Sequence, residues 1–294
     1  MRNSKLATLE EAIRRSGLRD GMTISFHHHF RGGDKVVNLV VDKLAEMGFK
    51  DLHLAASSLS DVHAPLIEHI RNGVITRIST SGLRGELANE ISHGLMKEPV
   101  VFRSHGGRGS AIADGTLHID ALPDAQYADH VVIVTDDLVP YPNVPKSISA
   151  CDVESVVVVP SVGDSSKISS GAIRDSKNPR DILIAKQAAK VVIHSGYFKD
   201  GFSIQTGTGG ASLAVVKYIR EQMLEQGIKA SFALGGITAH MVKLHEEGLI
   251  GSLIDVQSFD KVAAESLKND MFHQEVSAIE YASGMHKGSA VHAL

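Results

Sequence analysis

Short apolar runs alternate with amphipathic stretches as far as Lys268. The run MTISF at Met22–Phe26 has the length and composition of a strand, and apolar residues at helical spacing predict a helix over Val36–Met47. Further strands are expected at Leu52–Ala56, Val74–Ile78, Val100–Arg103, His130–Thr135, Val153–Val159, Ser231–Leu234 and Leu253–Val256, and further helices at Ala64–Asn72, Leu87–Gly94, 179–190, Gly209–Glu225, Thr238–Glu247 and Asp260–Lys268. This alternation predicts an α/β fold with a mostly parallel sheet flanked by helices.

Some of these segments allow a finer prediction. The valine-rich runs His130–Thr135 and Val153–Val159 are typical of strands buried on both faces. Val191–Ser195 is expected either to continue the preceding helix or to form a strand. Ser231–Leu234 is expected to end at the glycine pair that follows it. The stretch Val139–Ser149 resembles a long connection, so a weak subdivision is expected near residues 139–150 of an otherwise single domain.

Composition narrows the class of protein. The chain has 294 residues and a net charge of -4, and no basic stripe supports a nucleic-acid partner. No signal-peptide pattern and no apolar run near the roughly 20 residues of a membrane helix is present, which predicts a cytoplasmic protein without a membrane partner. Cys151 is the single cysteine, which excludes an internal disulfide and fits a reducing compartment.

Glycine-rich segments follow three of the expected strands, at the sheet edge where open α/β proteins bind ligands. They contain Arg31, Gly32 and Gly33 after the first strand, Ser81, Gly82, Arg84 and Gly85 after the third, and His105, Gly106, Gly107 and Arg108 after the fourth. Free N–H groups at the following helices can hold an oxyanion, and arginine can pair with a carboxylate. Tight glycine turns with solvated arginines are the alternative.

Two more glycine segments precede helices. They contain Gln205, Thr206, Gly207, Thr208, Gly209 and Gly210, and further on Gly235 and Gly236. A glycine loop at a helix N-terminus suits a phosphate-bearing cofactor. The first loop lacks the Lys-Ser/Thr ending of a P-loop, and no clean strand is expected just before it, so neither ATP nor NAD is predicted.

Other chemistries find little support. The 16 histidines show no metal-ligand spacing, and the adjacent His27, His28 and His29 would point to alternate sides of an extended segment, so no metal is predicted. No G-x-S-x-G elbow is present. Cys151 has no activating histidine beside it in the sequence. The catalytic group therefore stays unassigned.

Distinctive stretches, taken together, resemble the α subunit of bacterial citrate lyase. They include GVITRISTSGLRGELANEIS, RSHGGR, HSGYFKDGFSIQTGTGGASLAVVKYI and FALGGITAHMVKLHEEGLI, and the similarity runs from about Leu9 to Gly288. The resemblance implies a CoA-transferase (NagB/RpiA-like) fold. It also implies an enzyme, a citrate CoA-transferase that exchanges the acetyl group of an acetyl thioester for citrate and releases acetate.

The resemblance also implies partners and roles. The partners are citrate, acetyl-CoA, the lyase β subunit and a γ acyl-carrier subunit with a CoA-derived arm, within an oligomer. Gly32 and Gly33 are expected to bind the thioester oxyanion, and the remaining residues of the first three glycine segments are expected to bind citrate. The CoA-derived arm is assigned to the Gln205–Gly210 loop with Gly235 and Gly236.

The sequence departs from this family in two ways. The stretch Ala121–Asp129 is shorter than its family counterpart, and the chain stops soon after Gly288, before a second family domain. Residues 1–294 are thus expected to form the N-terminal CoA-transferase-type domain only. A catalytically inactive binding or assembly module of the lyase complex is an alternative function. A sugar-phosphate isomerase-like enzyme is another, because this fold hosts several chemistries.

Overall fold

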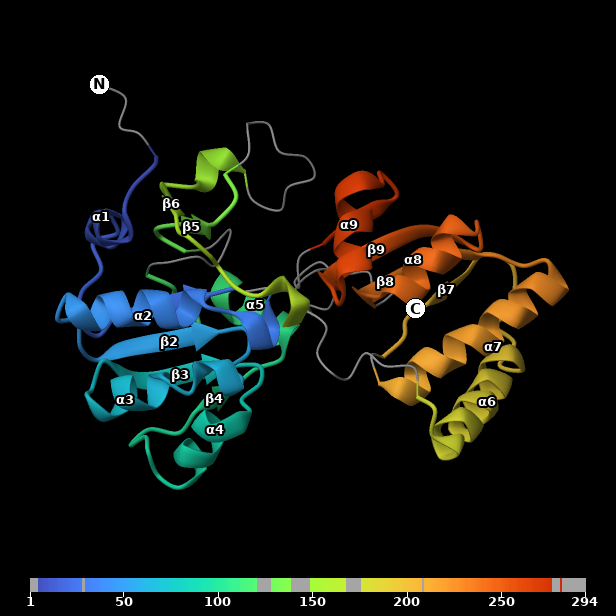
Figure 1. Ribbon diagram of the computed structural model, residues 1–294, viewed down its shortest axis with the longest axis horizontal. Helices are drawn as coiled ribbons and strands as arrows, with labels where there is room; N and C mark the ends of the chain where they lie inside the picture. The colour runs from blue at the N-terminus through green and yellow to red at the C-terminus, as the bar shows by residue number, and fades with distance from the viewer. Residues whose placement is uncertain are drawn as a thin grey trace. The chain divides into compact units, whose positions relative to one another are not determined.

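The chain is described here from a computed structural model, which covers residues 5–27, 30–120, 128–138, 149–167, 176–207, 209–276 and residue 281 (Figure 1). It divides into two compact units, Met1–Lys167 and Ile168–Leu294. The division lies beyond the weak subdivision expected near residues 139–150, of which 139–148 lie outside the described residues. That the whole chain forms one CoA-transferase-type domain stays a prediction.

The first unit is built on a parallel sheet with the strand order β1-β2-β3-β4. The strands are β1 (Thr23–Phe26), β2 (Leu52–Ala56), β3 (Ile75–Thr80) and β4 (Val101–Phe102), and the helices are α1 (Leu9–Arg15), α2 (Val36–Glu46), α3 (Leu66–Arg71), α4 (Gly85–Ser92) and α5 (His105–Ala113). The predicted strands and helices of this region are confirmed with shifts of one or two residues at most ends. Figure 1 shows α2 and α3 beside the sheet.

The two faces of this sheet differ. On β2, Leu52 and Leu54 face a large core to which α2 contributes Val40 and Leu44, all without exposed surface. Ala55 faces the other side and joins a smaller apolar cluster with residues of α5 and the segment after it. The alternation follows from the two-residue period of a strand.

Two further strands, β5 (Val132–Thr135) and β6 (Ser155–Val158), form a separate parallel pair. Val132 and Val157 are buried in the core of the first unit. Val158, however, is 50% exposed, and Ile133 on the same face is only half-buried. The expectation that these strands are buried on both faces was therefore wrong. Only one face of this two-stranded ribbon lies against the core.

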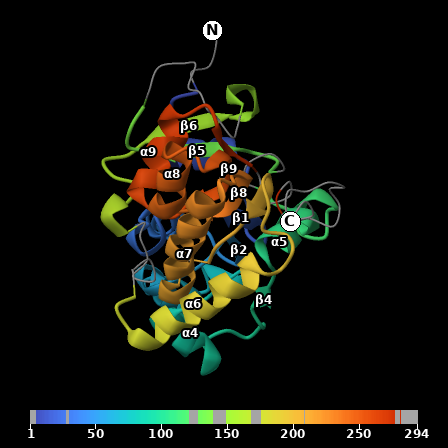
Figure 2. The same cartoon turned by 90° about the vertical axis from the view of Figure 1, so that its right-hand side faces the viewer.

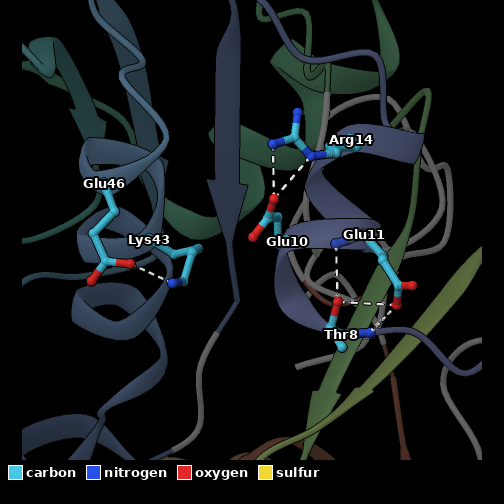
Figure 3. Close-up of polar contacts among 6 residues, drawn as sticks. All are labelled: Thr8, Glu10, Glu11, Arg14, Lys43 and Glu46. Carbon is cyan, nitrogen blue, oxygen red and sulfur yellow. Dashed lines mark hydrogen bonds and ion pairs between the residues drawn. The ribbon is translucent and has the colours of Figure 1, made fainter.

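The first helix begins with a reciprocal cap (Figure 3). The Glu11 main-chain N–H donates to Thr8 Oγ1 at 3.2 Å, and Glu11 Oε2 accepts from the Thr8 main-chain N–H at 2.8 Å. The two bonds satisfy donors that a helix start leaves unpaired, and the Thr8 main-chain bond lowers the pKa of the Glu11 carboxyl. Figure 3 also draws the ion pairs Glu10–Arg14 and Lys43–Glu46.

The second unit has its own parallel sheet, in the order β10-β9-β8-β7. Its strands are β7 (Phe202–Ile204), β8 (Ala230–Ile237), β9 (Ile250–Ser258) and β10 (His273–Glu275), and its helices are α6 (Pro179–Ile193), α7 (Gly210–Gln226), α8 (Ala239–Glu246) and α9 (Lys261–Asn269). Helices α6 and α7 lie side by side (Figure 2). Ile237, Leu253, Ile219 and Met241 are among the residues of its core.

The structure corrects several predictions in this unit. The short strand β7 precedes the Gly207–Gly210 loop, so the expectation of no strand there was wrong. Strand β8 runs through its glycine pair to Ile237, because Gly235 takes a φ of +101° at a register shift that a side chain would resist. The open choice at Val191–Ser195 is resolved as a continuation of α6 to Ile193. Within the described residues, no helix is long and apolar enough to cross a membrane.

Candidate functional site

The carboxyl ends of β1 to β4 lie along one edge of the first sheet. Phe26 pairs with Ala56, Ala56 with Thr80, and Thr80 with Phe102, so four strand ends form one row. The loops after β1, β3 and β4 are the glycine segments noted in the sequence. The structure therefore brings Gly32, Gly82 and Gly106 to a common edge, here called the rim of the first unit.

The loop after β1 is a single 3-10 turn, Arg31–Gly33. The Gly33 main-chain N–H donates to the Phe30 carbonyl at 2.8 Å, and the Gly33 carbonyl accepts from the Asp164 N–H at 2.9 Å. A Cβ at Gly33 would lie 2.2 Å from the Asp164 carbonyl oxygen, whereas a Cβ at Gly32 would meet no heavy atom within 4 Å. Close packing against Asp164 thus requires a glycine at residue 33. The Gly33 N–H is already bonded within the turn, whereas Gly32 faces open space.

The side chain of Asp34 connects this turn to the start of α2 and to the loop after β2. The carboxylate is fully buried, and it accepts from the main-chain N–H groups of Val36 at 3.3 Å and Val37 at 3.2 Å, at the start of α2. It also lies 3.2 Å from Nε2 of the equally buried His63, whose Nδ1 accepts from the Ser60 main-chain N–H at 2.9 Å. The loops after β1 and β2 are therefore held together by one buried pair.

The loops after β2 and β3 are joined by main-chain bonds. The Leu59 N–H donates to the Gly82 carbonyl at 2.8 Å, and the Arg84 N–H donates back to the Leu59 carbonyl at 3.0 Å. Gly85 has a φ of +75°, and a Cβ there would lie 1.7 Å from Asp61 Oδ1. A side chain at Gly85 would therefore separate these loops, which gives this glycine a structural role.

The segment after β4 is helical from its first histidine. Ser104 caps α5 by accepting from the Gly107 main-chain N–H at 3.0 Å. His105, in the first turn, places Nδ1 2.9 Å from the Ser81 hydroxyl oxygen. Gly106 is buried and Gly107 is exposed. The His105–Ser81 contact joins two glycine segments that the sequence could only propose as neighbours.

The three predicted arginines have different surroundings. Arg108 is only 7% exposed and donates to the Ser25 hydroxyl at 2.6 Å and to the Ala55 carbonyl at 3.2 Å, so its guanidinium ties α5 to β1 and β2. Arg84 is exposed at the rim. Of Arg31 the structure describes only the main chain.

Arg103, which directly follows β4, is a cation that the sequence analysis missed. Its side chain is half-buried. Among the described residues, neither the Arg84 nor the Arg103 guanidinium makes a hydrogen bond or an ion pair. Arg103 stands first in the RSHGGR stretch, so its place after the strand was the signal available in the sequence.

Another polar group lies on the α5 face of the sheet. His53 of β2 places Nε2 2.9 Å from Ser79 Oγ and Nδ1 3.3 Å from Thr23 Oγ1. Burial, and then the charges of Arg77 and Arg103, lower the pKa of His53 to about 4. The imidazole is thus neutral at physiological pH and links three strands through hydroxyl groups.

The glycines assigned to the carrier arm gather on the second unit, at the carboxyl edge of its own sheet. A Cβ at Gly235 would lie 2.9 Å from Gln205 Nε2, and a Cβ at Gly236 would lie 1.5 Å from the Phe259 ring. Gly209 caps α7, and a Cβ there would meet no heavy atom within 4 Å. Thr208 lies outside the described residues. That Gly209 shares a pocket with the rim of the first unit stays a prediction.

A buried network beside this edge was not predicted. Asp255 Oδ2 accepts from Ser258 Oγ at 2.5 Å and lies 3.2 Å from His273 Nε2, and all three residues are almost without exposed surface. Glu275 pairs in register with Asp255 across β10 and β9. Desolvation, and then the Asp255 charge, raise the pKa of the Glu275 carboxyl. His273 and Glu275 lie 15 to 20 residues beyond Ser258 and Asp255, so local pattern gave no signal for the contacts between β9 and β10.

Two other features bear on chemistry. His118, Asp120 and Asp129 place possible ligand atoms within 4.8 Å of one another. His118 pairs with Asp129 at 3.1 Å, and both side chains are more than 60% exposed, which also describes ordinary surface ion pairs. We assign no ion to this group. Cys151 is exposed in the short 3-10 turn Ala150–Asp152, and Oγ of the preceding Ser149 caps this turn by accepting from the Cys151 main-chain N–H.

The sequence of the chain is similar to those of known proteins. The profile of the citrate lyase alpha subunit family matches residues 3–123 and 120–294. The chain belongs to the citrate lyase alpha subunit family. It is 54% identical to the citrate lyase alpha chain of Escherichia coli over 99% of its own length, and 56% identical to that of Klebsiella pneumoniae over 96%. It spans 63% and 61% of these relatives, respectively.

The structure of the chain is also similar to solved structures, one of which belongs to the same family. The alpha subunit of citrate lyase from Streptococcus mutans, solved in complex with citrate, has a TM-score of 0.95 and 51% identity over all of this chain and 64% of that one. The malonate decarboxylase alpha subunit of Acinetobacter baumannii, at 13% identity and a TM-score of 0.62 over 87% of this chain and 52% of that one, shows a shared fold only. The predicted α/β fold of CoA-transferase type is confirmed.

The expectation that Ala121–Asp129 is shorter than its family counterpart also has support. The alignment to the Escherichia coli relative runs over 320 positions, more than the 294 residues of this chain, so that relative carries residues that this chain lacks. The two matches to the family profile meet at residues 120–123. This is the start of the stretch Ala121–Asp129 that the sequence analysis found shorter than expected. The relatives' names favour neither the inactive module nor the isomerase alternative.

Proposed function

We propose that this chain carries the citrate-binding half of an acyl exchange, in which citrate replaces acetate on a thioester. The observation that supports this most is the rim of the first unit. There the loops after β1, β2, β3 and β4 are held together by hydrogen bonds, and the Arg84 side chain lies exposed. The likeness to an alpha subunit solved with citrate points to the same ligand class.

The chemistry of the exchange fits such a rim. A citrate carboxylate attacks the acetyl carbonyl of the thioester and the thiolate leaves. The thiolate then attacks the citryl carbonyl of the mixed anhydride, and acetate leaves. Each addition passes through an oxyanion, which main-chain N–H groups can stabilise. The exposed turn at Gly32 is the candidate for this role, because the Gly33 N–H already donates to the Phe30 carbonyl within the turn.

Citrate brings three carboxylates, which need cations and hydroxyl donors. Arg84 and Arg103 supply charges that no carboxylate of the described residues neutralises by direct contact. Ser81 and His105 supply polar groups at 2.9 Å from each other. A guanidinium pairs with a carboxylate through two parallel hydrogen bonds, which fixes orientation as well as affinity. Arg108 is proposed to support the rim from inside, through Ser25.

The second unit is proposed to receive the CoA-derived arm. Gln205, Gly209 and Gly235 lie at the carboxyl edge of its sheet, and α7 begins there without a side-chain cap from Gly209. The first main-chain N–H groups of a helix have no partner within the helix, which suits them to phosphate. The proposed partners are acetyl-CoA or an acyl-carrier γ subunit, and a β subunit that cleaves the citryl thioester. The complex is proposed to be oligomeric and cytoplasmic.

Mass spectrometry tests the reaction directly. The purified chain is mixed with acetyl-CoA and citrate, and citryl-CoA and free acetate are expected in equal amounts. Arg84→Ala is expected to lower the rate at limiting citrate, whereas Arg180→Ala, an exposed arginine of α6, leaves it unchanged. Absence of citryl-CoA with this chain, together with absence of a melting-temperature rise in citrate, would contradict the proposal.

A further inference from the structure

A groove lies between helices α8 and α9 of the second unit. Its cavity volume is about 510 Å³, and both helices and the turn after α9 line it. Val242 and Glu246 of α8 face it at a spacing of four residues, and Val262, Glu265 and Asn269 of α9 face it at spacings of three and four. These spacings place the lining residues of each helix on one stripe. The groove is therefore the furrow between two neighbouring helical ridges.

This groove is separate from the glycine loops of the second unit. Helices α8 and α9 each connect parallel strands, so their C-terminal ends lie at the amino ends of β9 and β10. His245, near the end of α8, places Nε2 2.9 Å from Asp270 Oδ2, just after α9. The glycine pair of β8 lies at the opposite, carboxyl edge of the same sheet. A ligand in the groove would thus leave the glycine loops accessible.

The groove is bordered by apolar side chains that are unusually exposed. Met271 is 78% exposed, Phe272 57% and Val262 47%. Grouped apolar surface of this kind at a groove is typical of a binding site, because its removal from water is favourable. The buried side chain of Val242 forms part of the floor. An occupant would therefore need an apolar stripe of its own.

The walls of the groove are acidic. Glu246, Glu265 and Asp270 all line it. Glu246 makes no ion pair within the described residues, and Glu265 has only an exposed contact with Lys261 at 3.7 Å. The main-chain N–H of Phe272 and then His245 hold the pKa of the Asp270 carboxyl below its usual range, so it is ionised at neutral pH. Carboxylates on the walls favour a cationic occupant and repel nucleic acid or an anionic membrane.

We propose that this groove docks an amphipathic α-helix of a partner protein, with an apolar stripe flanked by lysine or arginine. A third helix can set its ridge of side chains into the furrow between two helices. Its apolar stripe would cover Val262, Met271 and Phe272, and its flanking cations would pair with Glu246 and Glu265. This is helix-in-groove recognition with electrostatic selection of the partner.

Peptide binding to the full chain tests this surface. The probe is a fluorescent designed helix of about 16 residues with leucine on one stripe and lysine on both flanks. The control peptide has the same leucines with glutamate flanks. Fluorescence polarisation is expected to show binding of the basic peptide that weakens as salt rises, and at least about tenfold weaker binding of the acidic peptide.

Variants locate the binding. Val262→Asp and Met271→Asp are each expected to weaken the basic peptide at least about tenfold, because both put a charge in the apolar contact. Glu246→Gln with Glu265→Gln is expected to remove most of the salt dependence. Val191→Asp alters an apolar residue of α6 that is 71% exposed, and it is expected to have no effect. Melting temperatures within about 2 °C of the parent show that each variant is folded.

Three results would overturn the proposal. They are no binding of the basic peptide, equal binding of both peptides, and unchanged affinity in folded Val262→Asp and Met271→Asp. The inference does not depend on citrate chemistry. An inactive chain that binds the peptide would count against the proposed function only, and an active chain that does not bind it would count against the groove only.

Discussion

The imidazole of His105 lies with Nδ1 2.9 Å from the hydroxyl oxygen of Ser81. His105 begins α5 after strand β4, and Ser81 lies in the loop after β3, so the bond joins two loops 24 residues apart in the sequence. Both side chains lie at the rim of the first unit. The pair is a compact polar surface on which a carboxylate could be received.

The first prediction concerns this pair. Ser81→Ala and His105→Ala are each expected to raise the KM for citrate about tenfold or more, because a hydrogen bond to a charged group contributes about 1.5–3 kcal/mol. Initial exchange rates against citrate concentration measure the effect. Ser92→Ala in α4 is the matched control, since Ser92 Oγ only donates to the Ala88 carbonyl. An unchanged KM in both rim variants would show that citrate does not contact them.

The second prediction compares two adjacent glycines. Gly33→Ala is expected to destabilise the chain by about 1–3 kcal/mol, because the new Cβ meets the Asp164 backbone oxygen rather than a movable side chain. Gly32→Ala meets nothing within 4 Å and is expected to change stability by less than about 0.5 kcal/mol. Urea unfolding measures both free energies. Equal stability of the two variants would contradict the described turn.

The third prediction concerns two histidine–aspartate pairs. His63 and Asp34 are fully buried with the atoms 3.2 Å apart, whereas His69 Nε2 and Asp42 Oδ1 are 2.7 Å apart at the surface. His63→Leu is expected to cost about 2–3 kcal/mol, because Asp34 and the Ser60 N–H each lose a partner inside the protein.

The surface pair provides the control. His69→Leu is expected to cost less than about 1 kcal/mol despite its shorter contact, because water replaces the lost partner. Urea unfolding of both variants at neutral pH compares them directly. A larger loss for His69→Leu would mean that contact length, and not burial, decides the contribution of these pairs.

Much of this fold was predictable and much of the rim was not. The apolar periodicity of α2 and the short apolar run of β2 predicted both elements almost to the residue. Helix α5 was missed because His105–Gly109 contains three glycines, which disfavour a helix; the Ser104 cap and the packing of Ala111 support it.

Side-chain partners across the rim left no local signal in the sequence. Asp34 and His63 are 29 residues apart, and nothing in the intervening pattern connects them. Arg108 belongs to the same glycine segment as the exposed His105 and Gly107. Its guanidinium is nevertheless buried, because helix α5 directs it against Ser25 of β1. The glycine segments were predictable as strand ends, because parallel strands place their carboxyl ends together.

The fourth prediction concerns pH. Burial, with Arg77 and Arg103, lowers the pKa of His53 to about 4 from its ordinary 6.5. Between these two pH values His53 binds a proton in the unfolded chain but not in the folded chain. The contribution of the neutral His53 to the free energy of unfolding is therefore complete above pH 6.5 and is lost as the pH falls towards 4. The loss is expected to be on the order of 2–3 kcal/mol.

His53→Gln isolates this contribution. The variant is expected to lose less stability than the parent chain between neutral pH and a pH of about 4.5, because glutamine does not titrate. Urea unfolding at both pH values gives the two differences. Parallel loss of stability in parent and variant would show that other groups dominate acid unfolding.

Citrate titration by calorimetry tests the central claim most directly, since it needs neither the thioester nor a partner. The parent chain and Gly209→Ala, which alters only the second unit, are expected to bind citrate with the same affinity. Ser81→Ala and Arg84→Ala are expected to bind it at least about tenfold more weakly. Equal affinity in all four proteins, or loss of binding in Gly209→Ala alone, would contradict a citrate site at the rim of the first unit.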